Sequence, residues 1–132
     1  MLDERRKDLS GYRLERAKEL IGDAKSLFAK GSWKSSNNRA YYSIFHALRA
    51  VLALEGVEFK KHSGNIQHFL KEYVKTGKFS VESSEIIMSA SRIRNASDYD
   101  DFYIASKSEA EDQIEAAEKF YIEVKKYLDD NN

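Results

Sequence analysis

The sequence predicts an all-α protein: an antiparallel up-and-down bundle of four long helices plus a shorter fifth. The 132 residues contain no proline, although average usage near ~5% would give about six or seven. Proline interrupts helices, so its absence favours long helices joined by short connections. Apolar residues also recur at steps of three and four in five stretches. No stretch alternates polar and apolar residues for long enough to form a sheet.

The first predicted helix ends at Lys30, because Gly31 follows it as a stop signal. It begins at Glu4 or at Tyr12, and Gly11 leaves the two starts open, since glycine weakens a helix interior. Its apolar stripe consists of Leu14, Ala17, Ile21, Ala24 and Phe28.

The second and third predicted helices occupy the middle of the chain. The second follows Ser32, a favoured N-cap residue, and ends at Gly56. The third runs from about Ser63 to Thr76 and is followed by Gly77. Their apolar stripes are Ala40, Ile44, Ala47, Val51 and Leu54 in the second, and Ile66, Phe69, Leu70 and Tyr73 in the third.

The fourth and fifth predicted helices complete the bundle. The fourth follows Ser80 and carries Ile86, Ile87, Ala90 and Ile93. The fifth begins at Ser106, where "SKSE" is a capping-box pattern that pairs Ser106 with Glu109. Acidic residues in its first turns complement the positive end of the helix dipole. Its stripe is Ile114, Ala117, Tyr121, Val124 and Leu128.

The composition indicates a single domain over residues 1–132. The chain has no cysteine, which excludes disulfides and thiolate metal sites. Its longest apolar segment, residues 41–54, is interrupted by His46 and Arg49, and it is shorter than the ~20 residues of a membrane span. No apolar stretch follows the charged N-terminus, so no signal peptide is expected. We expect a soluble cytoplasmic protein with no membrane association.

The net charge is zero, but the charge is unevenly distributed. Residues 30–79 carry nine basic and three acidic side chains together with all three histidines, whereas residues 80–132 carry six basic and thirteen acidic side chains. This asymmetry indicates either charge pairing within the fold or a basic face for a phosphate-bearing partner.

On the second predicted helix, Arg39, Tyr42, His46 and Arg49 recur at i, i+3, i+7 and i+10 and share one face. Two guanidinium groups, a phenol and an imidazole in a row can bind a phosphate or position a proton donor. The alternative is a solvated face whose arginines lie along neighbouring helices.

The loop before the third predicted helix reads "KKHSG" and contains Lys60, Lys61 and His62. Basic side chains beside backbone donors can bind an anion, although such a loop is usually only solvated. No histidine–carboxylate spacing of a metal site and no glycine-rich phosphate loop occurs in the sequence. We therefore expect no metal and no cofactor.

The fourth predicted helix ends in "SRIRNASDYDDFY", residues 91–103. Arg92, Asn95 and Tyr99 share one face, whereas Arg94 faces Asp98 at i+4, which is an ordinary surface pair. Arg94 and Tyr99 are about 140° apart on a continuous helix. They can reach one ligand only if the helix ends between them or if a second copy contributes. The aspartates that follow would by themselves repel RNA.

The segments "NNRAYYSIFHALRAVLALEG", "KHSG", "FLKEYVKTGKFS" and "SRIRNASDYD" occur in this order. Together they resemble the HEPN family, specifically its small stand-alone prokaryotic members, over about residues 10–128. The resemblance implies an up-and-down helical bundle that pairs as a homodimer through the helices bearing these segments. It also implies a toxin–antitoxin or defence role, either as a metal-independent ribonuclease or beside a minimal nucleotidyltransferase that silences the toxin.

The ribonuclease motif of that family is an arginine, usually followed by a polar residue, then four to six positions and a histidine. Arg94 and Asn95 fit its opening, but Tyr99 stands where the histidine is expected, and no histidine follows His68. Tyrosine, with a reference pKa near ~10, is a poor general base at pH 7.

Three functions stay open at this point. The first is a ribonuclease in which Arg94 stabilises charge on a phosphate while His46 or His62 replaces the missing histidine. The second is a module that binds RNA, a nucleotide or a nucleotidyltransferase without cleaving, and the third is a structural dimer whose arginines only bridge subunits. We expect Arg94, Asn95, Tyr99 and His46 to line a polar cleft at a dimer seam. Further ligand-binding candidates are Arg92, Arg39, Arg49, Tyr42 and His62.

Overall fold

The computed structural model describes residues 3–131. Within this range the chain forms α1 (Glu4–Ala29), α2 (Trp33–Glu55), α3 (His62–Phe69), the π-helical turn η1 (Leu70–Val74), α4 (Val81–Tyr99) and α5 (Lys107–Asn131). No strand occurs in the part of the chain that is described. The predicted all-α class is confirmed, with α3 and η1 together as the shorter fifth element.

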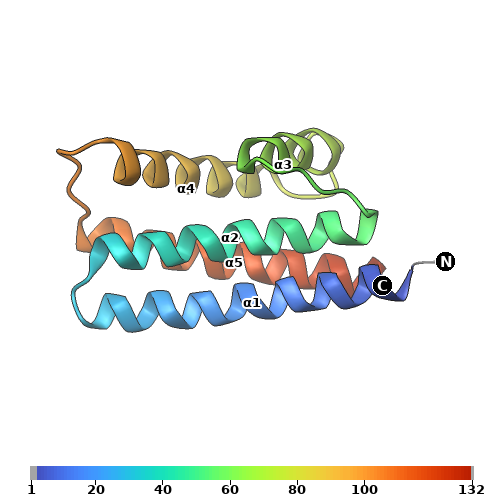
Figure 1. Cartoon of the computed structure of the whole chain (residues 1–132), viewed down its shortest axis with the longest axis horizontal. Helices are drawn as coiled ribbons and strands as arrows, with labels where there is room; N and C mark the ends of the chain where they lie inside the picture. Colours follow the sequence, from blue (N-terminus) through green and yellow to red (C-terminus); the bar gives the residue numbers. More distant parts are fainter. Residues whose placement is uncertain (1–2, 132) are drawn as a thin grey trace.

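Helix α2 lies at the centre of the bundle and packs against α1, α3, α4 and α5. Figure 1 shows the four long helices side by side, with consecutive long helices running in opposite directions. Helices α2 and α4, the second and fourth of the predicted helices, are neighbours in the bundle. None of the helices within residues 3–131 combines the length and apolar character needed to cross a membrane.

Helix α1 passes through Gly11 without a break, so it begins at Glu4 and not at Tyr12. Contacts with α2 hold it at this point, because the buried Ser10 hydroxyl donates to the Ala50 carbonyl at 2.7 Å. Two more buried serines on α2 donate in the same way to carbonyls of α1, namely Ser36 to Ala24 and Ser43 to Ala17.

Most helix ends follow the expected capping residues. Gly56 after α2 has φ 77° and Gly77 after η1 has φ 83°, a left-handed backbone that glycine adopts without strain. The Ser80 hydroxyl accepts a hydrogen bond from the Ser83 amide at the start of α4. Ser32 stands at the N-cap position of α2, but its side chain makes no capping hydrogen bond.

The predicted capping box at the start of α5 forms only in half. The Ser106 hydroxyl accepts from the Glu109 amide at 3.0 Å. The Glu109 carboxylate does not return to the backbone of Ser106, because it accepts hydrogen bonds from Tyr103 and from Asn37 on α2. Glu109 therefore ties the α4–α5 connection to α2.

The third predicted helix is regular only as far as Phe69 and continues as η1, where the sequence predicted one regular helix. In η1, Tyr73 is buried and donates to Glu55 at the end of α2 at 2.6 Å. Phe69 packs against Phe79 and Phe120 with ring centroids 4.9 and 5.8 Å apart. The hydrogen bond to Glu55 thus joins η1 to α2, and the contact with Phe120 packs α3 against α5.

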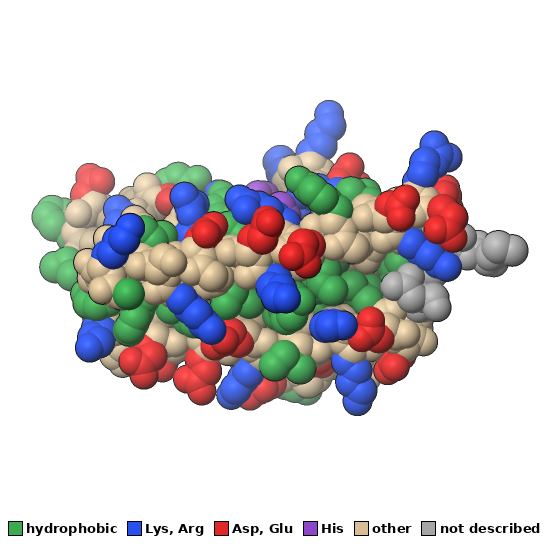
Figure 2. Space-filling view, turned by 90° about the horizontal axis from the view of Figure 1, so that it is seen from below, with side chains coloured by type: hydrophobic (Ala, Val, Ile, Leu, Met, Phe, Trp, Pro, Cys, Tyr) green, Lys and Arg blue, Asp and Glu red, His purple; other side chains and the backbone are tan. Residues whose placement is uncertain are grey.

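Charged side chains of both signs are interspersed on the face that Figure 2 shows, and hydrophobic side chains gather at its left end. Figure 1 places the α1–α2 and α4–α5 connections at that end. On the α1–α5 face, Lys25 pairs with Glu118 at 2.7 Å. This pair offsets one charge of the acidic excess in residues 80–132 with a lysine from outside the basic stretch 30–79.

Candidate functional site

A cleft of about 360 Å³ lies at the N-terminal end of α3 and is lined by residues of α2, α3 and α4 and of the segment before α3. Three structural elements and the segment before α3 contribute side chains to it. Its lining includes these polar or charged residues: Tyr41 of α2, Lys60, Lys61 and His62 at the start of α3, and Arg94 and Asn95 of α4.

Three of these side chains meet at one atom, Nδ1 of His62. The Tyr41 hydroxyl lies 2.8 Å from it, and Nη1 of Arg94 lies 3.4 Å from it. Arginine has hydrogens to donate and no acceptor, so a hydrogen bond from Arg94 requires that Nδ1 accepts and that the ring proton is on Nε2. This arrangement requires a neutral His62.

The surroundings favour that neutral state. Burial lowers the pKa of His62, and the positive charges of Arg94 and Arg49 lower it further. The His62 ring stacks on Phe45 with centroids 3.9 Å apart and planes 19° apart. Burial also raises the pKa of the Tyr41 phenol, against the effect of Arg94. Among these groups the guanidinium of Arg94 carries the charge that faces the cleft.

Aromatic rings support Arg94 and leave most of its donors free. Its guanidinium carbon lies 5.2 Å from the ring centroid of Tyr41 and 5.9 Å from that of Tyr42. Its Nε is 3.4 Å from the Asp98 carboxylate, the pair expected at i+4. That buried nitrogen nevertheless makes no hydrogen bond with any residue from 3 to 131. A guanidinium held in this way can still donate to a ligand.

The other contributions to the cleft are positive as well. Lys60 and Lys61 line it and make no ion pair within residues 3–131. Lys61 is also the N-cap residue of α3, and no side chain caps the helix there. Uncapped amides at a helix N-terminus attract anions. The cleft is therefore suited to a phosphate group.

His46 lies outside this cleft. It is not among the residues that line it, and its Nδ1 is buried without a hydrogen-bond partner in the described chain. Burial lowers the pKa of His46, as do the charges of Arg49 and Arg16. Of the two histidines considered as substitutes for the missing motif histidine, His62 is the one that contacts Arg94 within one chain.

The remaining members of the predicted stripe on α2 have separate contacts. Arg49 donates to Glu58 at 2.7 Å, and Arg39 is exposed and donates to Asn38 at 2.8 Å. Tyr42 is half-buried beneath the Arg94 guanidinium. Within one chain, these side chains have different partners, and none of them lines the cleft beside Arg94.

On α4, Asn95 lines the cleft with Arg94, whereas Arg92 and Tyr99 are exposed. The Arg92 guanidinium lies 3.5 Å from the Ser89 hydroxyl, and Tyr99 is 79% exposed. Helix α4 runs through Tyr99 without a break. Arg94 and Tyr99 consequently do not converge on one ligand within a single chain.

Tyr41 was not singled out from the sequence, although it is central to the cleft. The signal that could have found it is its spacing of four from Phe45, because such a pair shares a helix face. Both residues are buried and present parallel rings to His62. Across residues 3–131, no cluster of three or more histidine, aspartate or glutamate side chains could hold a metal ion.

Comparison with known proteins gives a consistent picture. The family model for the HEPN domain matches residues 10–127. A UPF0332 protein of Thermotoga maritima is 33% identical over 98% of this chain and 97% of its own length. A Methanocaldococcus jannaschii protein named "Putative toxin" is 33% identical over 90% of this chain and 81% of its own length. A UPF0332 protein of Archaeoglobus fulgidus is 30% identical over 90% and 94%, respectively.

Proposed function

This chain belongs to the HEPN domain family, and from that premise we propose that it is a toxin-like HEPN protein whose Arg94 cleft binds the phosphate groups of RNA. The toxin-like role is supported by the similarity to two relatives that carry that name, which covers 90% and 87% of this chain. The RNA-binding role is supported by the chemistry of the cleft.

One observation carries the proposal: Nη1 of Arg94 lies 3.4 Å from a neutral His62 in a cleft that also holds two lysines. A guanidinium can form two parallel hydrogen bonds to phosphate oxygens, a geometry that lysine cannot reproduce. Lys60 and Lys61 add charge that attracts the neighbouring phosphates along a strand. A nucleotide offers the same group, and we include it as a ligand of the same cleft.

A second candidate function is metal-independent ribonuclease activity, and the neutral state of His62 favours it. In this scheme Arg94 stabilises the charge that develops on the phosphate. Nδ1 of His62 accepts the proton of the 2′-hydroxyl as its oxygen bonds to phosphorus, which requires the Tyr41 hydroxyl and Nη1 of Arg94 to turn away from Nδ1 first. The P–O5′ bond breaks in the same step, and the departing 5′-oxygen takes a proton from water. Tyr99 is too far around α4 to take part in the same chain.

We further propose that the protein is a homodimer that pairs through the exposed side of α4. The α4–α5 connection presents Phe102 and Ile104, which are 91% and 87% exposed, directly after the exposed Tyr99 that ends α4. Large exposed apolar side chains in one region are typical of interaction surfaces. Pairing there would bring Arg92 and Tyr99 of two copies to the seam. A minimal nucleotidyltransferase is the partner class we propose for the assembly.

The test is to mix the purified protein with labelled single-stranded RNA in the presence of a chelator, and to record both binding and cleavage. Binding by wild type that is lost in Arg94→Ala supports the RNA-binding function. Cleavage products that also depend on Arg94 support the ribonuclease instead. If wild type neither binds nor cleaves RNA, the proposed function is wrong.

A further inference from the structure

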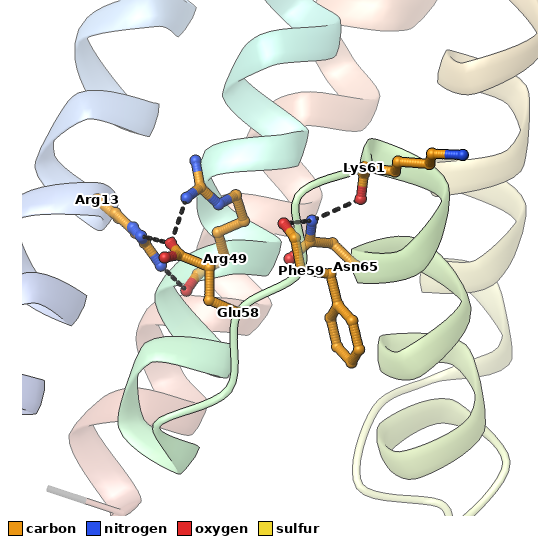
Figure 3. A network of polar contacts seen from close by, with 6 residues as sticks. All are labelled: Arg13, Arg49, Glu58, Phe59, Lys61 and Asn65. Carbon is orange, nitrogen blue, oxygen red and sulfur yellow. Dashed lines mark hydrogen bonds and ion pairs between the residues drawn. The ribbon is translucent and has the colours of Figure 1, made fainter.

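Residues 56–61 join α2 to α3. One carboxylate in this segment, that of Glu58, binds it to α1 and α2. Oε1 of Glu58 accepts a hydrogen bond from Nη2 of Arg13 on α1 at 2.5 Å and one from Nη2 of Arg49 on α2 at 2.7 Å. Figure 3 shows Glu58 between the two guanidinium groups. His62 follows directly after this segment and begins α3.

A second set of bonds closes the segment onto α3 itself. Nδ2 of Asn65 donates to the carbonyls of Phe59 at 2.9 Å and of Lys61 at 2.8 Å, also drawn in Figure 3. Asn65 belongs to α3, so these bonds shape the start of that helix without fixing it to α1. Glu58 supplies the side-chain connection from the segment to α1 and α2.

The Glu58 contact continues toward His62 through Arg49 and Phe45. The Arg49 guanidinium lies 5.7 Å from the Phe45 ring centroid, and the same ring stacks with the imidazole of His62 at a centroid distance of 3.9 Å. Glu58 thus constrains the backbone that leads into His62. It also constrains the Arg49 side chain, which lies next to the Phe45 ring on which His62 stacks.

The carboxylate is also needed to keep two like charges together. Arg13 is almost fully buried, with 9% of its side chain exposed, and its Nη1 donates to the Arg49 carbonyl at 3.2 Å. Hydrogen bonds from both arginines lower the pKa of Glu58, so it is ionised at neutral pH. Without that negative charge, two guanidinium groups would face each other across the segment.

We propose that Glu58 is a positioning residue: it holds the 56–61 segment against α1 and α2 so that His62 is stacked on Phe45 and meets Arg94. Its effect on ligand binding rests on the proposed function of the cleft. The effect of Glu58 on the position of His62 does not depend on the proposed function. The position of His62 and the affinity for ligand can therefore be measured separately.

The test follows the imidazole of His62 by NMR in the protein without ligand. A ring stacked face to face on Phe45 has its Hε1 resonance shifted upfield. In Glu58→Gln we expect that resonance to move downfield, toward the position of an unstacked histidine. We also expect the pKa of His62 to rise toward ~6.5. The titratable and charged groups around the imidazole are Tyr41, Tyr42 and Arg49 from α2, Arg94 from α4, and Lys60 and Lys61 before it.

The opposite results would overturn the proposal. An Hε1 position and pKa equal to those of wild type would show that Glu58 does not hold His62. A pKa that falls further while the ring stays stacked would show that Glu58 acts only by screening Arg49. Glu15→Gln, which removes an exposed carboxylate from α1, is the matched control and should leave the His62 resonance unchanged.

A second variant covers the case in which Glu58→Gln does not fold, which thermal unfolding will reveal. Glu58→Asp keeps the charge but shortens the reach to two guanidinium groups, and we expect a smaller downfield shift in the same direction; no shift there would overturn the proposal. RNA affinity measured on the same samples should fall several-fold in Glu58→Gln. If wild type binds no RNA, the proposed function fails while the NMR result still decides the role of Glu58.

Discussion

Nη1 of Arg94 lies 3.4 Å from Nδ1 of His62, although 32 positions separate the two residues in the sequence. A guanidinium so close to an imidazole is stable only while the imidazole is neutral, because two positive charges would repel each other. The pair is therefore a charged donor next to an uncharged acceptor, and the neutral imidazole leaves the positive charge of Arg94 available to a phosphate.

Substitution of Arg94 should weaken RNA binding. We expect Arg94→Ala to cost about 1.5–3 kcal/mol of binding free energy, the range for hydrogen bonds to a charged group. Arg94→Lys should recover only part of this, because an ammonium cannot form the two parallel bonds. Fluorescence anisotropy with a labelled RNA measures both. Arg5→Ala, which removes an exposed arginine of α1, is the control and should bind as wild type does.

The helical stripes were readable from the sequence because each is a local, periodic pattern. Gly56 and Ser80 mark the helix ends as expected, since their backbone and side-chain preferences act within a few residues. The start of α1 was not readable, because the Ser10–Ala50 bond that supports Gly11 joins residues 40 positions apart. The half-formed capping box has the same cause, since Tyr103 and Asn37 compete for Glu109.

The composition of the candidate site was only partly readable. Arg94 and Asn95 stand in a motif, and His62 was one of two histidines considered. Spacing on a single helix grouped His46 with Arg49, but it could not reveal that Glu58 binds the Arg49 guanidinium. His62 reaches Tyr41 because of the way α3 packs against α2. The periodicity of α2 alone does not show which other segment packs against Tyr41.

The dimer prediction can be tested with charges placed on the exposed apolar side. Light scattering should report a dimer for wild type and a monomer for Phe102→Glu, because a buried unpaired carboxylate is costly at an interface. Ile122→Glu makes the same kind of change at an exposed position of α5 and should leave the dimer intact. If wild type is a monomer at every concentration, the proposed dimer is wrong. Tyr99 of a second copy then cannot contribute to the cleft.

The aromatic cluster that docks α3 and η1 should be essential to stability. Phe120 is fully buried and touches Phe69 and Phe79, so Phe120→Ala should lower the free energy of unfolding by about 3–5 kcal/mol. Urea unfolding followed by circular dichroism gives the difference. Ile122→Ala, two residues away and 66% exposed, should stay within about 0.5 kcal/mol of wild type. Equal losses in both variants would contradict this account of the core.

If wild type cleaves RNA, the two histidines can be told apart by matched substitutions. We expect His62→Asn to abolish cleavage and to retain most of the binding, because Arg94 and the lysines are still present. His46→Asn should leave cleavage close to wild type, since His46 does not line the cleft. The reverse result, loss of cleavage only in His46→Asn, would place the proton carrier outside the cleft and argue for a site completed by a second copy.

Phosphate binding should be linked to protonation of His62. Burial, Arg94 and Arg49 depress the pKa of His62 in the free protein, and a bound phosphate beside it should raise that pKa, since an anion favours the charged imidazole. Binding therefore takes up protons, and by linkage the RNA affinity should increase as the pH falls from 8 toward 6. In His62→Asn this increase should become smaller, whereas His68→Asn, which removes a histidine paired with Glu55, should keep the wild-type slope. A pH titration of RNA affinity in the three proteins decides the point, and equal slopes in wild type and His62→Asn would mean that the bound phosphate lies away from His62.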